Sequence, residues 1–157
     1  MLKKFILMLI MSLIFSIANV EASAIYDGDD KTFVTDFNKS SEKFGNLKLK
    51  DFVFVDTIPM SNISVAKFEG LNKDSGISII KDNDEKITEI FAVTDTQDNA
   101  AKMFQTIFAI LDIQMFPYRE GLKDFKVKKN SAKKYVKVSV SVLEVKKQKV
   151  YTLSFRL

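Results

Sequence analysis

The sequence predicts an α+β domain, with about six strands in one antiparallel sheet and two helices packed on one face. Two observations predict this class. Apolar residues recur at helical spacing near residues 31–45 and 98–116, and they alternate at strand spacing in most other segments. The strands also follow one another at short intervals, which favours antiparallel neighbours because a parallel crossover needs a dozen or more residues. The expected order is helix, four strands, helix and two strands.

The first 24 residues have the features of a signal peptide that is removed. Two lysines precede an apolar run over residues 5–18. As a helix this run rises about 21 Å, less than the roughly 30 Å of a bilayer core. Ala22-Ser23-Ala24 then offers the small side chains that a signal peptidase accepts. We therefore expect export to the periplasm or the extracellular space, with one mature domain over 25–157; an uncleaved anchor is the alternative.

Both helices carry start signals in the sequence. Asp29 or Asp30 can cap the first helix, and Thr96 or Asp98 the second, by accepting free N–H groups of the first turn. The second helix is expected to end at Pro117, which cannot continue it. The stripe that the first helix should bury consists of Phe33, Phe37, Ser40 and Phe44.

Alternating and β-branched residues predict the strands. Four of them are expected over 47–56, 62–70, 76–80 and 86–95. The segment 117–133 reads as an irregular basic connector.

The last segment predicts a hairpin, because apolar residues alternate along two stretches of it. They are the even-numbered residues from Val136 to Val142 and the odd-numbered residues from Tyr151 to Leu157, and a hairpin can place both sets on one face. A two-residue loop at Lys146-Lys147 pairs Val140 with Leu153. A loop at Lys147-Gln148 pairs Val140 with Phe155 instead, and both registers keep the apolar faces together.

Several kinds of chemistry are excluded by composition. The chain has no His and no Cys, so it lacks the usual general base near neutral pH, thiol nucleophiles, His₂Cys₂ zinc sites and disulfides. Its five glycines are scattered, and none forms a phosphate-binding loop. The carboxylates Asp82, Asp84 and Glu85 fit a polar turn better than a calcium loop. We therefore expect a non-catalytic protein without cofactor or metal.

Charge is distributed unevenly along the chain. Residues 25–100 hold nine basic and fifteen acidic side chains, whereas residues 101–157 hold thirteen basic and four acidic ones. A basic segment of this kind suits an anionic lipid, an anionic polysaccharide or an acidic protein. Nucleic acid is disfavoured, because the basic stretch lacks aromatic residues at stacking spacing. The expected contact residues are Lys126, Lys128, Lys129, Lys133, Lys134, Phe116, Tyr118 and Arg119.

The sequence therefore predicts an exported binding module of a bacterial envelope that contacts a protein or an anionic component through its basic C-terminal part. Two alternatives are a structural or accessory envelope protein acting through a sheet edge or the 114–121 loop, and an enzyme built on carboxylates. The loop residues Phe116 and Tyr118 are expected to pack under the end of the second helix rather than to stay exposed.

The cleavage site gives a first testable prediction. Purified native protein should begin at Ile25, because Ala24 ends the small-x-small triplet after a short apolar run. Intact-mass measurement and N-terminal sequencing of the protein recovered from the native host test this expectation. Recovery of a chain that still carries Met1 would contradict it.

Overall fold

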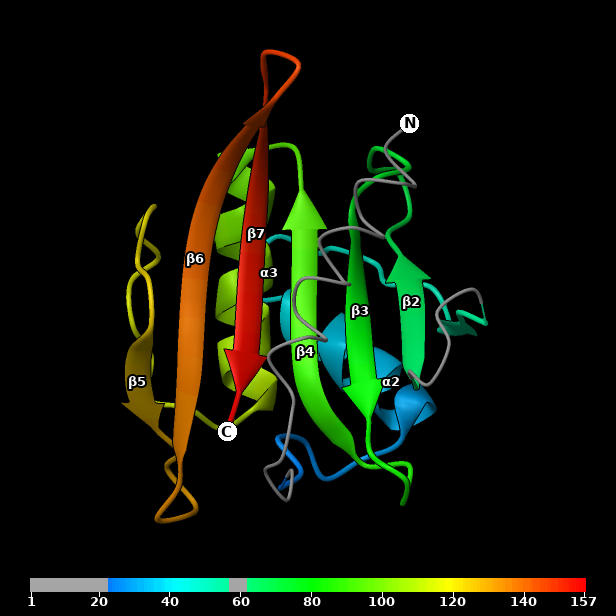
Figure 1. Cartoon of the computed structure of the whole chain (residues 1–157), viewed down its shortest axis with the longest axis vertical. Helices are drawn as coiled ribbons and strands as arrows, with labels where there is room; N and C mark the ends of the chain where they lie inside the picture. Colours follow the sequence, from blue (N-terminus) through cyan, green and yellow to red (C-terminus); the bar gives the residue numbers. More distant parts are fainter. Residues whose placement is uncertain (1–22, 57–61) are drawn as a thin grey trace.

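The computed structural model describes residues 23–56 and 62–157. These residues form two helices and seven strands (Figure 1). In chain order the elements are α2 (Asp30–Ser41), β1 (Val53–Phe54), β2 (Ile63–Lys67), β3 (Gly76–Lys81), β4 (Ile87–Thr94), α3 (Gln97–Ile110), β5 (Phe125–Lys128), β6 (Tyr135–Val145) and β7 (Gln148–Arg156). The strands lie in one sheet in the order β1-β2-β3-β4-β7-β6-β5, and every neighbouring pair is antiparallel.

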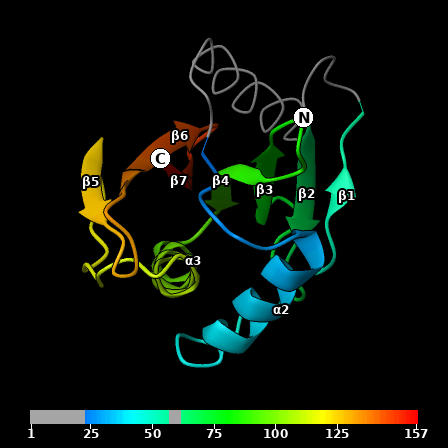
Figure 2. The ribbon, with the colours of Figure 1, turned by 90° about the horizontal axis from the view of Figure 1, so that it is seen from below.

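The two helices lie on the same side of the sheet, as Figure 2 shows in a view from below. They pack against each other, and α3 also packs against β4 and β7. We call the side of the sheet that they cover the helix face and the other side the second face. Because side chains alternate along a strand, each strand sends every other residue to each face.

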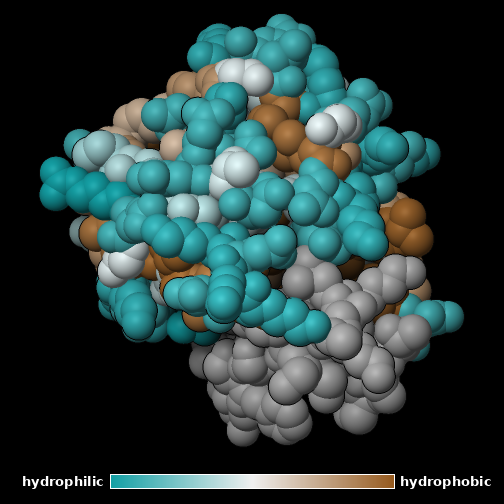
Figure 3. All heavy atoms as spheres, turned by 90° about the horizontal axis from the view of Figure 1, so that it is seen from above, coloured by the Kyte–Doolittle hydropathy of each residue, from teal (hydrophilic) through white to brown (hydrophobic). Residues whose placement is uncertain are grey.

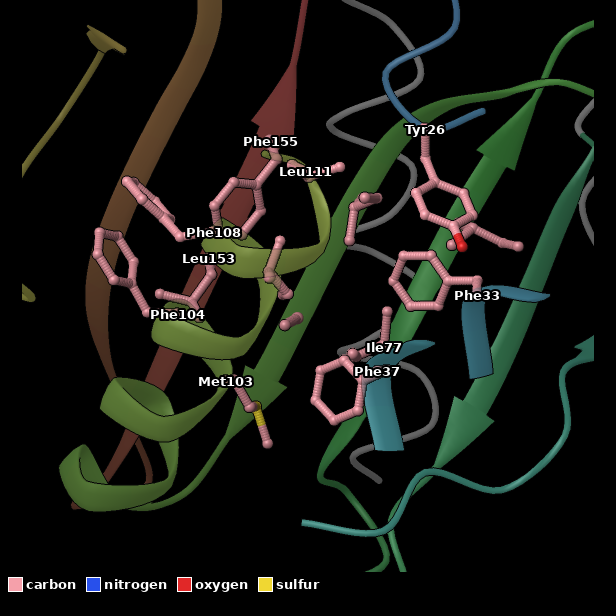
Figure 4. Close-up of a cluster of buried hydrophobic side chains, with 14 of the residues drawn as sticks. Tyr26, Phe33, Phe37, Ile77, Met103, Phe104, Phe108, Leu111, Leu153 and Phe155 are labelled. Atoms are coloured by element: carbon pink, nitrogen blue, oxygen red, sulfur yellow. The ribbon is translucent and has the colours of Figure 1, made fainter. Parts of the chain in front are cut away.

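Aromatic side chains fill the space between the helices and the sheet (Figure 4). On α3, the rings of Phe104 and Phe108 stack with centroids 4.2 Å apart, and both lie near Phe155 of β7. On α2, Phe33 and Phe37 form a second group. All five are essentially inaccessible to solvent, so they anchor the helices through the hydrophobic effect.

The second face has a smaller apolar group of its own. Phe91 and Val93 of β4 lie beside Val150 of β7, and the partly buried Val145 packs against them. Hydroxyl residues lie beside this group on the neighbouring strands, since Phe91 pairs with Ser78 on β3 and with Ser154 on β7.

The α+β class with a single antiparallel sheet is confirmed, but the sheet has seven strands rather than about six. The additional strand is β5, which lies inside the segment expected to be irregular. Its apolar residue Val127 is buried in the core, and four residue pairs join it to β6. Conversely, the expected strand over 47–56 is reduced to the two residues of β1 and one bridge between Leu49 and Phe68.

The helix starts agree with the sequence, but the ends differ. Asp29 caps α2 by accepting from the N–H of Thr32 at 2.8 Å, and Thr96 caps α3. The helix α3 ends at Ile110, well before Pro117, because the chain turns at Asp112 with a φ of 51°. The helix α2 likewise ends before Phe44. Its last turn therefore buries Ser41 rather than Ser40, and the Ser41 hydroxyl donates to the carbonyl of Leu47 at 2.6 Å.

The structure also chooses between the two hairpin registers. Val140 pairs with Leu153, so the loop is Lys146-Lys147. Both lysines have a positive φ, 51° and 66°, which is the backbone of a tight primed turn. Within the valine series, Val136, Val138 and Val140 are fully buried, whereas Val142 is half-buried near the tip of the hairpin.

The hairpin register predicts opposite effects at neighbouring positions. Val140→Asp places an unpaired carboxylate in the core on the helix face and should lower the unfolding free energy by roughly 4 kcal/mol or more. Ser141→Asp is the matched control, because its side chain points to the second face beside Thr152. Urea denaturation of both variants measures the difference. A larger loss for the Ser141 variant would show that the register is displaced by one residue.

Candidate functional site

Three cationic side chains lie side by side on neighbouring strands of the second face. Lys126 of β5 pairs with Lys137 of β6, and Lys137 pairs with Arg156 of β7. Arg156 points to the second face because its neighbour Phe155 points into the core. We call Lys126, Lys137 and Arg156 the basic row. Lys128 extends it along β5, where it is exposed and pairs with the exposed Tyr135.

Like charges directly opposite each other in a sheet repel, so the basic row costs the fold stability. Two carboxylates offset part of this cost. Asp124 lies 3.4 Å from the ammonium of Lys137, and a hydrogen bond from Ser139 together with that ammonium lowers the pKa of Asp124. At the other end of the row, Glu89 of β4 pairs with Arg156, with a carboxylate oxygen 3.9 Å from the guanidinium.

Glu89 is an unusual neighbour for this row, because it is buried. It is only 6% exposed, and neither of its carboxylate oxygens accepts a hydrogen bond from the described residues. Burial raises the pKa of Glu89, and Arg156 lowers it by a smaller amount. The two carboxylates therefore compensate the three cations only in part, and the row keeps a net positive charge.

The lysines that the sequence singles out lie in different environments. Lys126, Lys128, Lys133 and Lys134 are exposed on β5 and on the loop that follows it. Lys129 points inward instead. It is 8% exposed, and its ammonium donates to the carbonyl oxygen of Ile25 at 3.0 Å. The basic surface near β5 is thus formed by four of the five lysines that the sequence predicts as contact residues.

The aromatic residues of the 114–121 loop pack against the core. The ring of Phe116 lies 5.1 Å from that of Phe125, and the ring of Tyr118 lies 5.6 Å from that of Phe104. Burial raises the pKa of Tyr118 to about 12, and its hydroxyl has no hydrogen-bond partner among the described residues. Arg119 is exposed, and Met115, at 51% exposure, is the apolar part of this loop most open to solvent.

Two members of the basic row were missed from the sequence, although a signal for them was present. The register that pairs Val140 with Leu153 also pairs Lys137 with Arg156, since both pairs have the same sum of residue numbers. Lys126 joins them only through β5, which the sequence did not reveal as a strand.

The carboxylates of the β3–β4 turn are used to shape that turn. One oxygen of Asp82 accepts from the N–H groups of Asp84 and Lys86, both at 2.9 Å. Glu85 has a φ of 60°. Its carboxylate pairs with the ammonium of Lys81 at 2.7 Å and accepts a hydrogen bond from the side-chain amide of Asn62 at 3.0 Å.

Further searches of the chain give three findings. Within residues 23–56 and 62–157, no group of three potential ligand residues is arranged to hold a metal ion. No helix in these ranges has the length and apolar content to cross a bilayer. Comparisons with family models, curated proteins and solved structures returned no match to the chain.

The buried Glu89 gives a prediction of pH dependence. Its pKa is raised in the folded state, so the folded state binds the proton more tightly than the unfolded state does. The unfolding free energy should therefore fall as pH rises from the ordinary value of 4.5 through the raised pKa. Glu89→Gln removes this dependence, and the variant should gain stability relative to the parent as pH rises above the ordinary value of 4.5.

Urea denaturation across this pH range is the measurement. Glu69→Gln, at an exposed position after β2, is the control for the loss of one negative charge. If both variants changed with pH in the same way, the burial of Glu89 would not be the cause.

Proposed function

We propose that this protein is an exported, non-catalytic binding module that contacts an anionic component of the cell envelope through the basic row and its neighbour Lys128. The observation that carries the proposal is the direct pairing of Lys126 with Lys137 and of Lys137 with Arg156. This arrangement lowers the stability of the sheet, because adjacent like charges oppose folding. Local violations of a folding rule are expected at functional sites, where binding compensates for the lost stability.

The geometry suits an extended anionic surface. Cross-strand neighbours are roughly 5 Å apart, so the cations form a line about as wide as three strands. An array of this kind fits repeated phosphate, sulfate or carboxylate groups better than a single deep contact. Export is supported by the signal-peptide features of residues 1–24, and a non-catalytic role is supported by the composition, which lacks His and Cys.

Large apolar contacts find less support. Among the described residues, the exposed large apolar ones are Val53 and Phe54 of β1, Met115, Tyr135 and Leu157, so β1 is the one element that contributes two of them. Figure 3 shows hydrophilic residues over most of the face that it draws, with only small hydrophobic areas between them. For the alternative, a structural or accessory protein with a protein partner, the contacts that remain are Met115 in the 114–121 loop and Val53 and Phe54 on the edge strand β1.

The test is a salt series of binding to vesicles that contain anionic phospholipid and to immobilised heparin. Parent protein should bind both at low salt and be released as salt rises, because exposed charges are screened over about 8 Å at physiological ionic strength. Each cation near an anionic membrane is worth about 1 kcal/mol, so K126Q/K128Q/K137Q should weaken vesicle binding by roughly two orders of magnitude.

The matched control is K31Q/K39Q/K43Q, which removes the same net charge from exposed lysines on and just after α2. It should bind almost as the parent does, and thermal melts of both triple variants establish that they fold. If both triple variants weakened vesicle binding equally, the net charge of the protein rather than the basic row would explain the binding. Unchanged binding by K126Q/K128Q/K137Q would contradict the proposed surface and favour the loop around Met115.

A further inference from the structure

A small pocket lies away from the basic row, where three parts of the chain meet. The segment leading into α2, the C-terminal end of α3 and the loop after β5 enclose about 230 Å³. This is smaller than the roughly 300–1,000 Å³ of sites for drug-sized ligands, so an occupant would have the size of an amino acid. Its polar lining is Tyr26, Asp27, Thr32, Asp36, Asp112, Lys129 and Ser131, and its apolar lining includes Ile25, Ile110 and Leu111.

Lys129 gives the pocket a buried positive charge. Its ammonium has three N–H donors, and the carbonyl oxygen of Ile25 accepts from it at 3.0 Å. Ile25 is itself held in place, because it is fully buried and its N–H donates to the carbonyl of Ile87 at 2.8 Å. Cleavage after Ala24, as the sequence predicts, makes this nitrogen a terminal ammonium and adds a second positive charge at this end of the pocket. A carbonyl satisfies one donor of a buried ammonium but does not neutralise its charge, and Asp112, whose pKa Lys129 helps to lower, balances that charge in part. Lys129 is therefore suited to receive an anionic group.

The opposite charge comes from the lining carboxylates. The hydroxyl of Tyr26 donates to one oxygen of Asp36 at 2.5 Å. Burial and the bond to Asp36 raise the pKa of Tyr26, so this hydroxyl remains a donor throughout the physiological range. Asp112 is held by Asn130 and Ser131, and these hydrogen bonds lower its pKa. Asp36 and Asp27 are thus left as the carboxylates available to a cationic group.

We propose that this pocket binds a small zwitterion, of which a free amino acid is the simplest example. Its carboxylate would lie at the Lys129 ammonium, its amino group at Asp36 and Asp27, and its side chain against Ile110 and Leu111. A simple anion is disfavoured by the three aspartates, and a simple cation is disfavoured by the buried lysine. The inference is independent of the basic row, because the two features share no residue.

Isothermal titration of the purified full chain with leucine and with glycine tests the proposal. Leucine should bind saturably and raise the melting temperature by an amount that grows with the logarithm of its concentration, since a ligand of the folded state stabilises it. Isopentylamine and 4-methylpentanoate, which each lack one charged group of leucine, should bind at least about tenfold more weakly, as expected for the loss of one charge-assisted hydrogen bond.

Two variants locate the site. Lys129→Met keeps most of the length of the side chain but removes its charge, and Asp36→Asn keeps the shape of the carboxylate; each should weaken leucine binding by roughly tenfold or more. Asp84→Asn, on the exposed β3–β4 turn, should bind as the parent does. Circular dichroism confirms that each variant is folded. Absence of binding by both amino acids up to their solubility, or equal binding by the singly charged analogues, would overturn the proposal.

Discussion

The pairing of β6 with β7 is the constraint on which most of the structure depends. Nine consecutive residue pairs hold these strands in one register, from Lys137 with Arg156 to Val145 with Gln148. The register sends Val138, Val140, Leu153 and Phe155 towards α3, where Phe155 meets Phe104 and Phe108. A shift by one residue would exchange the two faces of one strand relative to the other and turn half of this core to the second face. The same register places Lys137 beside Arg156, so core packing and surface charge are set together.

Packing and charge are thereby separated onto the two sides of one sheet. The helix face is the place where buried apolar area stabilises the fold, and its aromatic residues come from both helices and from β7. The second face carries the basic row, partly offset by Asp124 and by the buried Glu89. Part of the acidic surplus of the N-terminal half is not near the basic row, since Asp27 and Asp36 line the pocket near the start of α2. Charges of the two halves of the sequence thus meet at two places, at Glu89 with Arg156 and in the pocket at Lys129.

The sequence was most informative where local patterns were long. The α+β class, both helix starts and the valine face of β6 follow from spacing and capping residues alone. Shorter features were missed, because tertiary contacts determine them. The strand β5 exists through its pairing with β6, and α3 ends at Ile110 because Ile113 pairs with Lys129 instead of continuing the helix. The inward position of Lys129 was also hidden, since its hydrogen-bond acceptor, Ile25, lies 104 residues earlier in the chain.

The two outermost strands of the sheet are also its shortest. β1 has two residues and β5 has four, whereas β6 and β7 in the interior have eleven and nine. Unpaired strand edges are templates on which other chains add and aggregate, and short edges that carry lysines discourage such addition. The lysines of β5, Lys126 and Lys128, meet this requirement whatever else they bind. At the β5 edge, short length and lysines thus oppose the addition of another strand without the help of any disulfide bond.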